Sequence, residues 1–200
     1  MLKKLLLFCL ILSMSLFSLY GCKESTGIGS EKIVEQSQSN KPNWLNNPPA
    51  TDSEFIYFVG ETESASSSGV RDAYQVSVAK ITQYLETVAS QAYESIEKSF
   101  GKQRSKTMSE QLIQNISKKN IIRGAKEKSN YWQKMEVTTQ QGVTYYYRVY
   151  SLVMYPKTFV KQAVEGSINN QIKEAQANND KELQVSLEQT RAKLLAEINK

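Results

Sequence analysis

The sequence predicts an α+β fold, in which an antiparallel sheet of about three strands packs on a long helix and a C-terminal helical tail follows. Three observations predict this class. A short apolar run at 55–59 is typical of a buried strand, an apolar stripe of helical period runs over 69–100, and residues 131–153 alternate with a period of two. The expected order of elements is therefore β-α-α-β-β, followed by the helical tail.

The first strand and the long helix are the clearest of these elements. The run Phe-Ile-Tyr-Phe-Val at 55–59 is rich in aromatic and β-branched residues, which favour a pleated conformation, and Gly60 ends it. A polar loop is expected at 61–68, and then a helix from Gly69 to Phe100. The apolar face of that helix consists of Val78, Ile81, Leu85, Val88, Ala92 and Ile96, spaced at steps of three and four.

A second helix, a hairpin and further helices complete the pattern. Residues 107–110, Thr-Met-Ser-Glu, match a capping box, so a helix is expected over 108–119. Two strands follow at about 131–138 and 143–153, and the residues between them, Thr-Gln-Gln-Gly at 139–142, have the character of a hairpin turn. Pro156 suits the first turn of a helix, and the polar helical tail is predicted at 157–200.

The first 22 residues resemble an export signal. Lys3 and Lys4 precede an apolar stretch at 5–19 that is too short to span a bilayer comfortably. The stretch ends in Leu-Tyr-Gly-Cys at 19–22, which resembles a bacterial lipobox. This resemblance implies a signal peptide over 1–21, cleavage between Gly21 and Cys22, and covalent acyl groups such as palmitate on Cys22. An ordinary cleaved signal peptide and a short membrane anchor are the alternatives.

Composition limits the chemistry that is open to the rest of the chain. Residues 1–21 contain two of the 25 basic residues and none of the 20 acidic ones, so the remainder carries a net charge of +3. That mild charge does not indicate a nucleic-acid partner. The chain has no histidine, and its two cysteines are Cys9 and Cys22. We therefore expect no catalytic residues, no metal ligands and no cofactor besides the lipid on Cys22, and we do not expect an enzyme.

Residues 22–41 are rich in Ser, Gln, Glu, Lys and Asn and predict a flexible tether. The folded domain is expected over 42–156, and it begins with Pro42 and Trp44.

Two weaker signals have simpler explanations. The S-x-x-K matches at 77–80 and 95–98 lack the S-D-N and K-T-G motifs that accompany them in penicillin-interacting enzymes, so chance explains them better. A group of acidic residues near the first strand could hold a cation or act as a carboxylate pair, but a solvated loop is favoured. These residues are Asp52, Glu54, Glu61 and Glu63.

The hairpin carries an aromatic stripe, half of which should lie in the core because side chains alternate along a strand. The other half, Trp132, Tyr146 and Tyr150, is the candidate interface, because Tyr and Trp bury a large area at low entropic cost. Packing within the monomer, a protein interface and a ligand-stacking platform all remain open.

Several segments together carry a family resemblance. They are Pro42-x-Trp44-Leu45, the strand ending Tyr57-Phe58-Val59-Gly60, a long helix with Ala73 and Ala79, and an antiparallel hairpin, all behind a lipobox. The combination is similar to the twenty-kilodalton outer-membrane lipoprotein family (the LPP-twenty type), which includes flagellum-associated lipoproteins, and it covers about residues 41–156. The resemblance implies a sheet curled around a long helix, no established catalytic activity, outer-membrane attachment and self-association. In some members it implies a place in a scaffold around the flagellar basal body.

We therefore expect an envelope lipoprotein, anchored to the outer membrane by its lipid, that acts as a structural or interaction module. Its expected partners are further copies of itself or other envelope proteins. A module that binds peptidoglycan or a small ligand is the alternative function, and the outer face of a cytoplasmic membrane is the alternative location.

Overall fold

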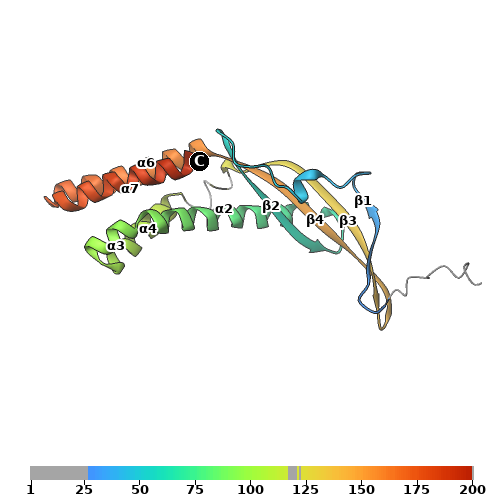
Figure 1. Ribbon diagram of the computed structural model, residues 1–200. Helices are drawn as coiled ribbons and strands as arrows, with labels where there is room; N and C mark the ends of the chain where they lie inside the picture. Colours follow the sequence, from blue (N-terminus) through green and yellow to red (C-terminus); the bar gives the residue numbers. More distant parts are fainter. Residues whose placement is uncertain (1–26, 117–120, 122, 200) are drawn as a thin grey trace, which may run out of the picture.

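The computed structural model describes residues 27–116, 121 and 123–199, and it confirms the α+β class. Figure 1 shows an elongated molecule, with a long hairpin at one end and helices gathered at the other. In chain order the elements are β1 (Glu31–Gln36), η2 (Asn43–Leu45), β2 (Phe55–Ser64), η3 (Ser67–Gly69), α2 (Val70–Ala92), α3 (Glu94–Phe100), α4 (Lys102–Asn115), β3 (Lys126–Thr139), β4 (Gly142–Pro156), α6 (Lys157–Ala177) and α7 (Lys181–Asn199).

The sheet is antiparallel and has four strands in the order β1-β3-β4-β2, one more than the sequence predicted. The additional strand, β1, lies inside the segment 22–41 that was predicted to be a flexible tether, so that prediction is wrong over Glu31–Gln36. Five of its six side chains are exposed. It joins the sheet through backbone pairing with β3. Because its side chains are mostly exposed, the segment has no buried apolar pattern from which a strand could be predicted.

Helix α2 packs along one face of the sheet, against β2 and β4, as predicted. We call this the inner face; Val149, Ser151 and Val153 point to it and are fully buried. The hydroxyl of Ser77 on α2 donates a hydrogen bond to the carbonyl of Ser151 at 3.1 Å, which fixes the helix over the middle of β4. The opposite face is called the outer face.

The helical pattern over 69–100 is interrupted at Tyr93, where α2 ends and the short α3 begins. Gly101, at φ 86°, ends α3, and α4 starts directly after it at Lys102. The predicted start near 108 is therefore wrong. The Thr107 hydroxyl donates to the carbonyl of Gln103 at 3.0 Å, so this residue lies inside α4 and does not cap it.

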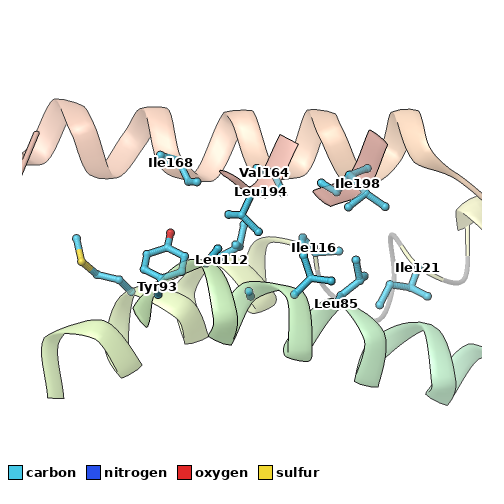
Figure 2. Close-up of a cluster of buried hydrophobic side chains, with 14 of the residues drawn as sticks. Leu85, Tyr93, Leu112, Ile116, Ile121, Val164, Ile168, Leu194 and Ile198 are labelled. Atoms are coloured by element: carbon cyan, nitrogen blue, oxygen red, sulfur yellow. The ribbon is translucent and has the colours of Figure 1, made fainter. Parts of the chain in front are cut away.

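The predicted tail at 157–200 is helical, but it belongs to the folded body. Figure 2 shows Val164 and Ile168 of α6 and Leu194 of α7 facing Leu85 and Leu112 across the core. Polar groups also contribute, because the buried Tyr93 hydroxyl donates to Oε1 of Gln171 at 2.7 Å. The narrow apolar stripes and the buried polar residues made these helices look like an independent polar tail.

The loop before β2 is held by the carboxylate of Asp52. It accepts hydrogen bonds from the backbone N–H groups of Phe55 (2.7 Å) and Glu54 (2.8 Å) and from the hydroxyl of Tyr57 (2.7 Å). These hydrogen bonds hold the pKa of the Asp52 carboxyl below its ordinary value of 3.8, because they favour its ionised form.

This arrangement predicts a defined pH dependence. The pKa of Asp52 is lower in the folded state than in the unfolded state, so its stabilisation is complete above the unfolded value of 3.8 and is lost as the pH falls through the folded value. We expect Asp52→Asn to lower the melting temperature at neutral pH and to flatten its decline in acid. Thermal melts of both proteins across this pH range test the prediction, and parallel declines would contradict it.

Candidate functional site

The structure separates the three residues of the predicted interface. Trp132 pairs with Val149, whereas Tyr150 pairs with Tyr131, and Tyr146 pairs with Met135. Directly paired residues point to the same face of a sheet, so Trp132 lies on the inner face and the two tyrosines lie on the outer face. The prediction of one shared surface for these three residues is therefore wrong.

The outer face carries an ionic cluster centred on Arg148 of β4. Its guanidinium lies 3.1 Å from the carboxylate of Glu31 on β1, 3.6 Å from that of Glu61 and 3.9 Å from that of Glu63, both on β2. The sequence placed Glu61 and Glu63 in a loop, but β2 extends to Ser64 and carries them. The cluster links both edge strands to the middle of the sheet.

Two tyrosines complete this cluster. The hydroxyl of Tyr146 donates to Glu31 at 3.0 Å and accepts from Arg148 at 2.6 Å. These contacts hold the pKa of the Glu31 carboxyl below its ordinary value, the hydrogen bond from Tyr146 contributing most. Burial, together with the charge of Glu61, raises the pKa of Tyr150 to about 12. Both tyrosines are half-buried and serve the packing of the monomer.

A second group of side chains lies on the inner face, from the level of the fully buried Val149 toward the hairpin turn. We call Trp132, Lys134 and Tyr147 the aromatic patch. The rings of Trp132 and Tyr147 meet edge to face with their centres 5.4 Å apart. The ammonium of Lys134 lies 6.0 Å from the ring centre of Tyr147 and 5.2 Å from that of Tyr145.

The aromatic patch is half-buried, and its exposure increases toward the turn. Tyr145, the next aromatic side chain on this face, is 55% exposed, and Val143 beyond it is 52% exposed. Sequence reasoning missed Lys134, Tyr145 and Tyr147 as neighbours of Trp132. The signal that could have found them is the length of the turn, which sets the register of the hairpin.

Both edges of the sheet carry features that discourage further strand pairing. The register of β1 with β3 shifts between Ile33 and Glu35, which is the mark of a bulge. On the other edge, Lys80 of α2 donates from its ammonium to the carbonyl of Val59 at 2.7 Å. Bulges and edge lysines protect open strands. The faces of the sheet are therefore better suited to contact with a partner than its edges.

Local contacts explain the serines of both S-x-x-K matches. The hydroxyl of Ser77 is bonded to Ser151, and Lys80 reaches the edge of β2, so this S-x-x-K match does not form a serine–lysine pair. In the second match, the hydroxyl of Ser95 lies 3.5 Å from that of Thr190 on α7.

The structure also has surface grooves. One, of about 430 Å³, lies along α2 beside Val78, Ala79 and Thr82. Another, of about 330 Å³, lies between α2 and α7 beside Val88 and Leu194.

Among the described residues, no helix is long and apolar enough to cross a membrane. Gly21 and Cys22, the predicted cleavage and lipidation residues, lie outside the described residues.

No family model matches this chain, and comparisons with curated proteins and with solved structures likewise found no match. The resemblance to the LPP-twenty family therefore stays a prediction.

Proposed function

We propose that this chain is an envelope lipoprotein, anchored to a membrane through acyl groups on Cys22, that acts as a non-catalytic structural module and self-associates. The lipobox-like string at 19–22 supports the anchor. The chain has no histidine, and Cys22 is its only cysteine after the apolar leader, which supports a structural role over thiol- or imidazole-based catalysis. By its resemblance to the LPP-twenty family, the outer membrane is the proposed location.

The observation that supports self-association best is the aromatic patch. Trp132 and Tyr147 are large, half-buried side chains in ring contact on the inner face, and residues of this kind contribute most of the binding energy at protein interfaces. The protected edges of the sheet point to contact through its faces. The proposed contact is therefore with the hairpin of a second copy, side by side on the same membrane.

This proposal predicts a concentration-dependent oligomer of the chain from residue 22 with Cys22→Ala, measured by sedimentation equilibrium. Trp132→Thr and Tyr147→Thr are each expected to weaken association by about tenfold or more, because truncation of an aromatic hot-spot residue costs about 2 kcal/mol or more. Threonine keeps the preference for a strand.

Phe159→Ala is the matched control, because Phe159 is a 43% exposed aromatic on α6, away from the hairpin. It should leave the association unchanged. Thermal melts of each variant show whether its fold is intact. A wild-type protein that stays monomeric at high concentration would refute the proposed self-association.

A further inference from the structure

Residues 27–30, which lead into β1, lie beside the turn of the β3–β4 hairpin. The backbone N–H of Gly29 donates to the carbonyl of Thr138 at 2.7 Å, and the N–H of Thr138 donates to the carbonyl of Ser30 at 3.2 Å. Thr138 lies next to the last residue of β3, so the segment that leads into β1 is attached to the far end of the hairpin. Figure 1 shows this end on the opposite side of the molecule from α6 and α7.

The small number of residues between Cys22 and Gly27 determines which end of the molecule lies near the membrane. Five residue steps separate Gly27 from Cys22, and a fully extended chain covers at most about 3.6 Å per residue, so the two lie within about 18 Å of each other. β4 alone has 15 residues, which corresponds to about 50 Å of strand. An anchor at or before Cys22 therefore keeps the hairpin turn near the membrane, whether that anchor is a lipid or an uncut leader.

The turn of the hairpin and the residues on both sides of it carry no charge. Residues 137–147 contain no Asp, Glu, Lys or Arg, and this is the longest uncharged run after Cys22. The described residues include seven exposed large hydrophobic side chains, and five of them lie on the hairpin's far half or the segment paired with it. These five are Ile28, Ile33, Val34, Val143 and Tyr145.

We propose that the hairpin tip, defined as Ile28 and residues 139–145, inserts into the headgroup region of the bilayer that carries the anchor. Tyr145 suits this place because its ring is apolar while its hydroxyl donates to the carboxylate of Glu136 at 3.1 Å, and tyrosines gather at the water–membrane boundary. The helices α3, α4, α6 and α7 are then held away from the membrane. This inference rests on the proposed membrane attachment, and it adds a second, non-covalent contact with lipid.

Quenching of tryptophan emission by brominated lipids tests this contact. The chain has two tryptophans, so Trp44→Phe and Trp132→Phe give a background in which a single new tryptophan reports its own position. Val143→Trp places it at the tip, and Val185→Trp places it on α7; the two valines are 52% and 54% exposed, which makes them a matched pair. The full chain is expressed in a bacterial host, purified from its membranes and reconstituted in vesicles of brominated phosphatidylcholine and phosphatidylglycerol.

For the Val143→Trp variant we expect about a twofold or greater loss of emission in brominated vesicles relative to unbrominated ones, because an interfacial indole lies close to the acyl chains. The Val185→Trp variant should lose none. A third variant, which combines Val143→Trp with Tyr145→Glu, should be quenched less, because a carboxylate opposes burial of the tip. Thermal melts of the double-phenylalanine background establish that its fold is intact.

The mass of the purified chain separates failure of this inference from failure of the proposed function. A lipidated Cys22 with equal, weak quenching at both positions would overturn the tip contact and leave the lipoprotein proposal standing. An uncut leader with strong quenching only at position 143 would refute lipidation and support the tip contact. A cut, unmodified chain that does not bind vesicles would refute both.

Discussion

Replacement of Gly60 by alanine is expected to lower the free energy of unfolding by about 3 kcal/mol or more. Gly60 is buried on the inner face of β2, where α2 crosses the strand. A Cβ atom added there would collide with the backbone oxygen of Ala73 and would lie 2.6 Å from the hydroxyl of Ser77. Neither group has room to move, because Ala73 is fully buried and Ser77 is bonded to Ser151.

Gly166 provides the control for this prediction. It lies in the interior of α6, and a Cβ atom at this position would meet no atom within 4 Å. Gly166→Ala should therefore stabilise the protein by about 0.5–1 kcal/mol, because alanine loses less backbone entropy in a helix. Urea denaturation of both variants measures the two effects. A Gly60→Ala protein as stable as the wild type would mean that α2 does not approach β2 as closely as the structure has it.

Local patterns were sufficient to predict the main elements of this fold. The period of two over 131–153 predicted β3 and β4, and the structure places both there, with Gln140 and Gln141 as the turn. The apolar stripe that starts near Gly69 predicted α2. These patterns can be recognised within one segment, because the apolar residues of a helix or strand recur at the period of that element.

The candidate site was harder to predict because it depends on the pairing of two strands. Alternation shows which residues of one strand share a face, but the register decides which face of β3 joins which face of β4. The two-residue turn pairs Thr139 with Gly142, so over residues 129–139 the even-numbered residues of β3 are directly opposite odd-numbered residues of β4. Trp132 consequently lies beside Tyr147 and not beside Tyr146 or Tyr150.

The second large effect is expected at Leu187 on α7. This residue is fully buried in the cluster that α7 forms with α2, α3 and α6. Leu187→Ala should lower the free energy of unfolding by about 2–5 kcal/mol, because it removes buried apolar contacts and leaves a cavity in the core. If 157–200 were an independent tail, the same substitution would leave the stability of the sheet and of α2 unchanged.

Val185→Ala distinguishes the two cases. Val185 is on the same helix, two residues away, but it is 54% exposed, so its replacement should change the stability by less than about 0.5 kcal/mol. Urea denaturation monitored by helix content and by tryptophan fluorescence reports on the helical end and on the sheet separately. Because Trp44 and Trp132 lie outside the helical end, a Leu187→Ala transition that shifts equally by both probes indicates that α7 and the sheet unfold as one unit. A shift in helix content alone would mean that the helical end unfolds independently of the hairpin.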